Sequence, residues 1–475
     1  MFRKYEYYSC NAKKTESKLR LGADMLVSFS CGNFLSYDSI QTISLAGGKK
    51  LRTKKGHLYY PKTSSAILKT GVLKFAAVYG ANSAGKSNFF KAMNVLRSYV
   101  LSGHIVQNSA ELYCRIKDEN KEKPSFFEIC FLVDDVPYTY GLKVDMQKKL
   151  VVSEWLYFTK AEEKKYLFKK DSLESGIVFG SVLENCREIK VLANVFSGGE
   201  SPFLYCMNHN TKSFYEKNAS AVILRRIFEW FAKSFEVIYP DQPINDTALL
   251  DDSCSLKDYA ELLKKFGTGI VEIKKEEVSE DKVKANLSFI DKTNLDFQMN
   301  MARTNSIISG QKSHWSAVIR NRANIFTIKL DESGNAKYYA LKFVHQYGDE
   351  KVDYEMRRES DGTYRLFQLL DVLMTAKNKV FVIDEISRCM HPLLTIKFIE
   401  TFFEVVKDRN VQLVVTTHET RLMSHKFLRR DEVWVCDSQA DGSSKLSNFD
   451  AKQVRIDKVM DENYLEGNFG GVPRI

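Results

Sequence analysis

Several features that would place this chain in other classes are missing from its sequence. No apolar run is long enough to span a membrane and no signal peptide is visible, so a cytoplasmic protein without a membrane partner is expected. The 9 cysteines are odd in number and form no Cys-x-x-Cys pair, which fits reduced thiols rather than a disulfide framework. The 8 histidines show no zinc-ligand spacing.

Internal repeats, low-complexity linkers and long heptad arms are also missing, so a coiled-coil machine is not expected. What is present is a 475-residue chain with 44% hydrophobic residues, enough for two or three domains or for one large domain with insertions. The formal charge of +10 permits nucleic acid or another acidic partner but does not demand one.

The most informative stretch lies near the front of the chain. An apolar run at 72–79 leads directly into Gly80-Ala-Asn-Ser-Ala-Gly-Lys-Ser87, and Phe89, Met93, Leu96 and Val100 then repeat at helical spacing. Strand, glycine-bounded loop and helix in this order are the context of a Walker A phosphate loop. The alternative is a chance Gly-Lys-Ser in a surface turn, which the full spacing and both flanks disfavour.

The residue types of this loop suit a triphosphate. Gly80 and Gly85 let backbone N–H groups approach the phosphates, Lys86 supplies a point charge, and the Ser87 hydroxyl is placed to ligate Mg²⁺. The residues expected to bind nucleotide here are Gly80, Asn82, Ser83, Ala84, Gly85, Lys86, Ser87 and Asn88.

A second apolar strand, Val380-Phe-Val-Ile-Asp-Glu385, ends in two acids and matches the Walker B pattern. Ligands bind at the carboxyl ends of such strands. We expect Asp384 to hold Mg²⁺ through water and Glu385 to act as the general base for the attacking water. Taken alone, a strand that ends in acids by accident is a real alternative.

Two further segments accompany these acids. Ser360-Asp-Gly362 opens a helix, and a Ser and a Gly at a helix N-terminus can form an anion site. The apolar strand 411–416 delivers Thr417 and His418 to the same sheet edge, where His418 is a candidate sensor of the γ-phosphate.

The rest of the chain is predicted more coarsely. Strands are expected at 25–45, 126–133, 138–144, 150–158 and 165–169, and this meander predicts an antiparallel sheet on the nucleotide core. Residues 181–265 read as mostly helical, with Ser255 and Asp258 as a capping pair. The charge-rich segment 272–284 suits an exposed helix or loop, and strands are expected at 324–330 and 337–345.

Domain borders follow from these patterns. We expect a polar N-terminal extension at 1–24, an N-terminal lobe with Walker A at 25–180, a helical or lid insertion at 181–350, and a C-terminal lobe at 351–475. Residues 1–24 are either an ordered arm or lie before a true start at Met25.

In this order, Walker A, the Ser-x-Gly signature, the paired acids and the histidine resemble ABC-type ATPases of the SMC/RecF-like branch. More narrowly, the chain resembles stand-alone AAA-type ATPases of bacterial abortive-infection and restriction-linked phage-defence loci. The segments that carry this resemblance are 80–88, Leu262-Leu-Lys-Lys-Phe-Gly-Thr-Gly-Ile270, Glu359-Ser-Asp-Gly-Thr-Tyr-Arg-Leu-Phe367 and Asn463-Tyr-Leu-Glu-Gly-Asn-Phe-Gly-Gly-Val-Pro473.

The resemblance implies an α/β fold, an ABC-type P-loop ATPase head with a parallel core sheet, an antiparallel β subdomain and a mostly helical insertion. It also implies a head-to-head dimer in which ATP on one subunit is closed by Ser360 and Gly362 of the other. The sequence departs from the pattern in two places. Gln107 is no clear Q-loop glutamine, and no aromatic A-loop is evident, so the choice of ATP over GTP stays open.

Two functions from different classes follow. The first is an ATP-hydrolysing switch, with ATP and Mg²⁺ as cofactors, that controls a separately encoded effector such as a toxin or nuclease in anti-phage defence. The alternative is an ATP-gated DNA clamp of RecF-like type, which the basic residues at 49–55, 320, 322, 357 and 358 motivate. A nuclease activity of the chain itself has no acidic cluster beyond Walker B to support it.

Overall fold

The computed structural model describes residues 22–49, 51, 53–63, 65–105, 109–160, 162–196, 198–209, 214–242, 244, 249, 255–309, 315–375, 378–424, 426–450, 460–468 and 470–472. Most of the expected N-terminal extension lies outside these residues. The chain divides into a larger unit, comprising Leu21–Asp241, Ala376–Ser387 and Ile399–Ile475, and a smaller unit. Among the described residues the smaller unit comprises Gln242–Thr375 and Arg388–Phe398.

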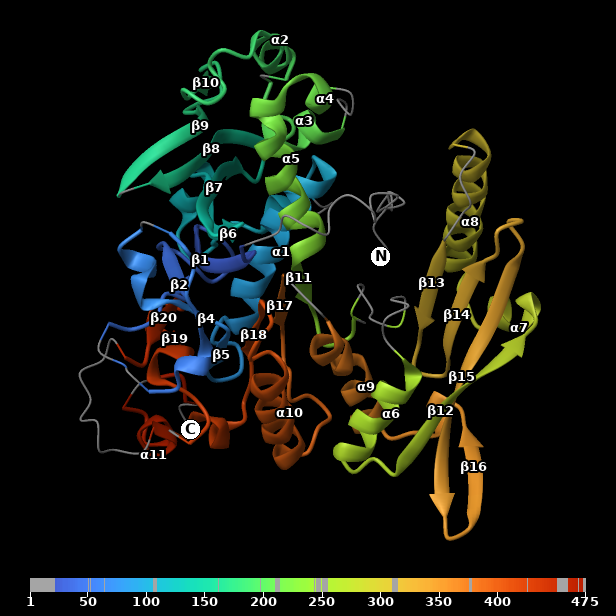
Figure 1. Cartoon of the computed structure of the whole chain (residues 1–475). Coiled ribbons are helices and arrows are strands. Elements are labelled where there is room, and N and C mark those ends of the chain that lie inside the picture. Colours follow the sequence, from blue (N-terminus) through green and yellow to red (C-terminus); the bar gives the residue numbers. More distant parts are fainter. Residues whose placement is uncertain are drawn as a thin grey trace. The chain divides into compact units, whose positions relative to one another are not determined.

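A six-stranded sheet forms the core of the larger unit (Figure 1). Its strands, in spatial order, are β11 (Phe235–Ile238), β17 (Lys379–Ile383), β18 (Val411–Thr416), β5 (Phe75–Tyr79), β19 (Val433–Ser438) and β20 (Ser444–Asn448). Every pair from β11 to β19 is parallel, and only β20 runs antiparallel. Strands β5 and β18 are wholly buried, which explains their unbroken apolar sequences.

An antiparallel sheet of seven strands is the second layer of the larger unit. Its order is β10 (Val178–Phe179), β9 (Glu163–Lys170), β8 (Leu150–Lys160), β7 (Val136–Asp145), β6 (Ser125–Val133), β1 (Met25–Gly32) and β2 (Gln41–Ser44). Strands β3 (Leu58–Tyr59) and β4 (Val72–Leu73) form a separate pair. The expected antiparallel β subdomain is therefore confirmed.

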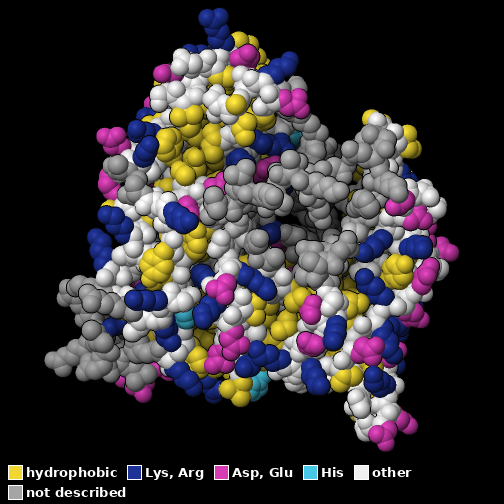
Figure 2. All heavy atoms as spheres, in the orientation of Figure 1, with side chains coloured by type: hydrophobic (Ala, Val, Ile, Leu, Met, Phe, Trp, Pro, Cys, Tyr) yellow, Lys and Arg dark blue, Asp and Glu magenta, His cyan; other side chains and the backbone are white. Residues whose placement is uncertain are grey.

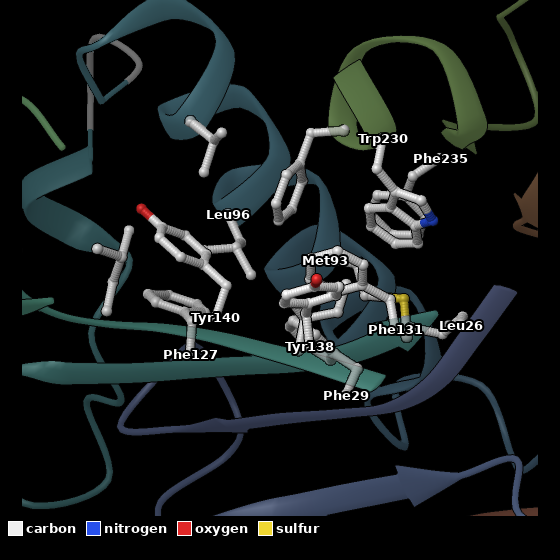
Figure 3. Packing of buried hydrophobic residues seen from close by; sticks show 14 of the residues in the cluster. Leu26, Phe29, Met93, Leu96, Phe127, Phe131, Tyr138, Tyr140, Trp230 and Phe235 are labelled. Atoms are coloured by element: carbon white, nitrogen blue, oxygen red, sulfur yellow. The ribbon is translucent and has the colours of Figure 1, made fainter. Parts of the chain in front are cut away.

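Helix α1 (Lys86–Ser102) packs its apolar face into the core of the larger unit. Figure 3 shows Met93 and Leu96 of α1 above the strands that carry Phe29, Phe127 and Phe131. The four residues at helical spacing in the sequence are all buried. In the described part of this unit the other α-helices are α2 (Arg187–Val195), α3 (Phe203–His209), α4 (Phe214–Lys217), α5 (Val222–Glu229) and α11 (Met460–Leu465), and a π-helical turn spans Trp230–Ser234. The border between the units falls within α10 (Pro392–Val405).

The smaller unit is built on a five-stranded antiparallel sheet. Its strands are β12 (Ile270–Val278), β15 (Ala336–Tyr347), β14 (Ile325–Leu330) and β13 (Ser316–Arg320) in this order, with β16 (Glu350–Tyr354) also paired to β15. Its helices are α6 (Leu256–Lys265), α7 (Glu280–Ala285), α8 (Phe289–Ser309) and α9 (Asp361–Met374). Ser255 and Asp258 form the expected capping box at the start of α6.

Two predictions are wrong. The insertion expected at 181–350 is not mostly helical, because it carries β12, β13, β14 and β15 of the antiparallel sheet of the smaller unit. The charge-rich stretch expected as a helix or loop is strand β12 over Ile270–Val278, and only the following residues are helical. β12 lies at the sheet edge, where charged side chains face solvent and pair across strands, as Glu276 does with Lys342 at 3.3 Å. The strands expected at 324–330 and 337–345 are confirmed as β14 and β15. No helix in the described ranges is both long and apolar enough to cross a membrane.

Candidate nucleotide-binding site

The carboxyl ends of three parallel strands meet at one edge of the core sheet. Strand β18 lies between β17 and β5. Ile383 pairs with Val415, and Thr416 pairs with Val78, so the three strands end at nearly the same level. Since paired strands lie about 4.8 Å apart, the segments that follow them are neighbours. These segments are the loop 80–85, the acids after β17 and the histidine after β18.

The loop after β5 has the backbone that its glycines allow. Gly80 has a φ of +154° and Gly85, which precedes α1, a φ of +108°. A Cβ on Gly80 would lie 2.4 Å from the carbonyl oxygen of Cys436, and one on Gly85 would lie 2.1 Å from Ser444 Oγ. Both positions therefore exclude a side chain by conformation and by space.

Lys86 starts α1 and turns its ammonium back under the loop. Its Nζ donates hydrogen bonds to the carbonyl oxygens of Gly80 at 2.8 Å and Ala81 at 2.9 Å. Burial lowers the pKa of Lys86, and the nearby charges of Asp384 and Glu385 oppose that shift. The ammonium and the two acids therefore share one neighbourhood, although about 300 residues separate them in the chain.

The outer side of the loop is anchored by residues that the sequence did not reveal. The carbonyl oxygen of Ala84 accepts hydrogen bonds from Ser444 Oγ at 2.6 Å and Cys436 Sγ at 3.0 Å. The Tyr37 hydroxyl donates to the carbonyl oxygen of Gly85 at 3.0 Å. These anchors come from the segment after β1 and from the β19–β20 hairpin, so no local motif could have identified them.

The middle of the Walker loop and the residues that follow it are more exposed to solvent. Asn82 and Ser83 are exposed, and Ser83 has a φ of +62°. Ser87 is half-buried in the first turn of α1. Asn88 donates from Nδ2 to Ser36 Oγ at 2.9 Å, which ties the start of the helix to the segment after β1.

The acids after β17 are joined by a threonine on the neighbouring strand. Thr416 Oγ1 donates to Asp384 Oδ1 at 2.6 Å and accepts the backbone N–H of Glu385 at 2.7 Å. Asp384 is buried, and its own N–H is bonded to the carbonyl oxygen of Ile238 on β11 at 2.9 Å. Glu385 has a φ of +50°, a conformation that non-glycine residues rarely adopt and that often marks functional sites.

His418 follows β18 with its side chain exposed. Partial desolvation lowers the pKa of His418, the Lys86 charge lowers it further, and Glu385 and Asp384 act in the opposite direction. The imidazole is therefore neutral at pH 7 and able both to donate and to accept a hydrogen bond.

The Ser-x-Gly signature belongs to the smaller unit. Ser360 caps helix α9, because its Oγ accepts the backbone N–H of Thr363 at 3.0 Å. A Cβ on Gly362 would lie 2.9 Å from the carbonyl oxygen of Cys389. Arg322 braces the turn before the helix by donating to Asp361 Oδ1 at 2.7 Å and to backbone carbonyl oxygens at Met356 and Glu359.

The structure thus brings Lys86, Asp384, Glu385 and His418 together at one sheet edge of the larger unit and places Ser360 and Gly362 in the smaller unit. Gln107 lies outside the described residues. Within the described ranges, no three His, Cys, Asp or Glu side chains cluster as a metal site on their own. A Ser87 hydroxyl and an Asp384 carboxylate instead suit Mg²⁺, which takes oxygen ligands and is usually completed by phosphate and water.

Three features at this sheet edge define the class of protein. They are a phosphate loop after one parallel strand, paired acids after a second, and a histidine after the strand between them. This is an α/β P-loop ATPase head of the ABC type, with a parallel core sheet and an antiparallel β subdomain, as the sequence predicted. Residues 75–424, well over half of the chain, match the family described as "AAA domain, putative AbiEii toxin, Type IV TA system". The chain therefore belongs to this family, and the resemblance to abortive-infection ATPases is confirmed.

Solved structures with a similar arrangement include SMC heads. An SMC head bound to the C-terminal winged-helix domain of ScpA is 13% identical, with a TM-score of 0.37 over 89% of this chain and 96% of that one. The SMC head domain of Thermotoga maritima is 12% identical, with a TM-score of 0.33 over 89% and 98%. The Pyrococcus furiosus SMC head with bound ScpA domain is 14% identical, with a TM-score of 0.37 over 89% and 96%. No curated protein matches this sequence.

Proposed function

We propose that this protein is an ATP-hydrolysing switch whose ATP-bound state closes a homodimer and controls a separately encoded effector. One observation carries the proposal most directly: Lys86, Asp384, Glu385 and His418 converge at a single sheet edge beside a loop whose glycines at 80 and 85 have positive φ. Family membership supports nucleotide binding and ATPase chemistry.

Each side chain has a distinct role in this proposal. Lys86 exchanges its bonds to the loop carbonyls for bonds to the β- and γ-phosphates. Ser87 and Asp384 hold Mg²⁺, which when bound neutralises phosphate charge. Glu385, with its backbone held by Thr416, orients and deprotonates the attacking water. Neutral His418 donates a hydrogen bond to the γ-phosphate.

Closure requires the signature of a second copy. Ser360 and Asp361 are exposed at the N-terminus of the 14-residue helix α9, where backbone N–H groups favour an anion. In the proposed dimer, Ser360 and Gly362 of one copy complete the site of the other. The effector and the anti-phage role rest on the family description alone, which refers to a toxin–antitoxin system.

The alternative of a DNA clamp is less well supported by the charges. Arg320, one of the basic residues that motivated it, is buried and paired with Asp371. Lys54 donates to a backbone carbonyl oxygen at Lys426, and Arg322 is engaged around the signature turn. On the face shown in Figure 2, Lys and Arg side chains are interspersed with Asp and Glu. DNA binding that depends steeply on salt concentration, together with ATPase activity that DNA stimulates, would favour this alternative.

Two variants test the proposed function. Lys86→Ala should abolish ATP binding in isothermal titration calorimetry, because it removes the positive charge that the loop offers to the phosphates. Glu385→Gln should still bind ATP but lower the turnover number by about 100-fold or more, since a general base contributes on this order. With ATP and Mg²⁺, Glu385→Gln should elute as a dimer in size-exclusion chromatography.

A matched control for the second variant is Glu419→Gln, which changes a nearby glutamate whose side chain accepts only the N–H of Arg421 among the described residues. It should keep wild-type turnover. Hydrolysis by Glu385→Gln at the wild-type rate would show that the assigned roles are wrong, and ATP binding by Lys86→Ala would place the nucleotide elsewhere.

A further inference from the structure

Residues 460–468 and 470–472, here called the C-terminal strap, pack against the start of the Walker loop although they lie almost 400 residues downstream of it. Its helix α11 carries Tyr464, whose ring centroid lies 5.9 Å from that of Tyr79, the last residue of β5. Burial raises the pKa of Tyr464 to about 12, so its hydroxyl keeps its proton throughout the physiological range. The hydroxyl is therefore a permanent donor beside the first residue of the loop.

The Tyr464 hydroxyl joins the two ends of the strap beside the start of the loop. It donates to the carbonyl oxygen of Gly471 at 2.7 Å, and a Cβ on Gly471 would be in van der Waals contact with Gly80. Gly80 is also the residue whose carbonyl oxygen receives the Lys86 ammonium at 2.8 Å. Gly80 thus contacts both the strap and the side chain that we assign to the phosphates.

The end of the strap is fitted to β19 by a glycine. Gly471 has a φ of +73°, and its N–H donates to Asp437 Oδ1 at 2.8 Å. A Cβ at this position would lie 2.5 Å from Val435 Cγ1 and 3.4 Å from the Cα atom of Gly80. Only glycine allows the chain to pass this close to the start of the phosphate loop.

The strap also reaches the segment that carries the histidine. Tyr79, which packs against Tyr464, donates through its hydroxyl to the carbonyl oxygen of Glu419 at 3.3 Å. Glu419 directly follows His418, and helix α11 contacts the 3-10 turn Thr420–Met423 beyond it. The strap therefore contacts residues next to two parts of the site, the phosphate loop and the segment that carries His418.

We propose that the C-terminal strap is a positioning element of the nucleotide site and that Tyr464 is its key residue. By packing Gly471 against Gly80 and the ring of Tyr464 against that of Tyr79, it keeps the phosphate loop in the shape that receives a nucleotide, so that less ordering is needed on binding. This inference rests on the proposed function, because it assumes that the nucleotide binds at Lys86.

The test is equilibrium binding of ATPγS with Mg²⁺ to the full chain, together with the thermal midpoint measured without nucleotide. Tyr464→Phe removes the hydroxyl and keeps the ring, and we expect its dissociation constant to rise about five- to tenfold, the effect of one lost hydrogen bond. The matched control is Tyr215→Phe, which removes a hydroxyl that donates to the carbonyl oxygen of Met207, away from the site. It should bind like the wild type, with a comparable thermal midpoint.

A second pair of variants keeps the test independent of the hydroxyl. Gly471→Ala and Gly467→Ala both place a side chain at a positive φ in the strap, but only the first directs it toward β19 and Gly80. Gly471→Ala should therefore weaken binding more than Gly467→Ala does.

The outcomes separate the two proposals. Unchanged ATPγS affinity in Tyr464→Phe, or equal losses in both tyrosine variants, would overturn the strap's role while Lys86→Ala still fails to bind. If Lys86→Ala binds ATPγS like the wild type, the proposed function fails, and the inference that rests on it falls with it.

Discussion

Thr416 donates a hydrogen bond from its hydroxyl to Asp384 over 2.6 Å, and the same oxygen accepts the N–H of Glu385. One side chain on β18 thus holds both acids that follow β17. A buried carboxylate with a fixed donor is held in one orientation, which is what a Mg²⁺ ligand needs. The strained backbone of Glu385, with a φ of +50°, is held by the same threonine.

We expect Thr416→Val, which keeps the shape and removes the hydroxyl, to lower ATPase turnover by about 10- to 100-fold, as loss of a partner of a metal ligand does. It should also lower the free energy of unfolding by about 1–3 kcal/mol, because a buried carboxylate and an N–H lose their partner. Steady-state kinetics and urea unfolding measure both effects. Thr401→Val is the matched control, since the buried Thr401 hydroxyl has no hydrogen-bond partner among the described residues. Equal effects from the two variants would contradict the role given to Thr416.

Gly85→Ala should weaken ATP binding and lower the free energy of unfolding by about 1–2 kcal/mol, the order of penalty for a side chain in left-handed backbone. The new Cβ would also lie 2.1 Å from Ser444 Oγ. The double variant Gly85→Ala/Ser444→Ala removes the contact with Oγ. It keeps the φ of +108° and the approaches of 2.8 Å to Ser444 Cβ and Ser36 Oγ, so we expect only partial recovery of affinity relative to Ser444→Ala. Full recovery in isothermal titration would show that backbone conformation at Gly85 is unimportant.

Arg322→Ala should impair ATP-dependent dimerisation and lower the ATPase rate several-fold, with little change in ATP affinity. The arginine braces the turn that presents Ser360 and Asp361, whereas the nucleotide is expected on the larger unit. Arg357→Ala is the control, because Arg357 is an exposed neighbour paired with Glu355 at 2.9 Å. Analytical ultracentrifugation with ATP measures dimerisation. An Arg322→Ala dimer as stable as the wild-type dimer would argue against the signature's part in closure.

A pH dependence of stability follows from Glu154. Burial raises the pKa of this carboxyl to about 7, although the N–H groups of Phe203 and Leu204 and the Tyr140 hydroxyl donate to it. Between about pH 4.5 and pH 7 the folded chain keeps a proton that the unfolded chain has lost. The free energy of unfolding should therefore fall by about 3 kcal/mol as the pH rises through this window.

Glu154→Gln should flatten this part of the pH profile in chemical denaturation between pH 5 and pH 8. The control is Glu128→Gln, which alters a glutamate on strand β6 of the same sheet that accepts a hydrogen bond from Trp155. That variant should retain the slope of the wild type. If the Glu154→Gln profile keeps the wild-type slope, the slope has another origin.

The sequence by itself determined the local parts of this protein. The strand, the glycine-bounded loop and the helix of segment 72–100 could be predicted together. Hydrophobic periodicity and glycine conformation are local properties, so the sequence shows them directly. For the same reason the apolar strands that end in Asp384-Glu385 and Thr417-His418 could be identified before any fold was known. The prediction of a helix or loop at 272–284 is wrong for the part that lies in β12, because an edge strand carries the same mixed charges as a solvated helix.

Only the tertiary structure decided what surrounds these parts. Thr416, Tyr37 and Ser444 touch the Walker loop or its acids, and Tyr464 packs against the last residue of the strand before that loop. Each is an ordinary residue in its own stretch of sequence. Their roles come from the order of strands in the sheet, which places β18 between β17 and β5 and β19 beside β5. Hydrogen bonds between residues hundreds of positions apart leave no periodic signal in one chain, so packing alone reveals them.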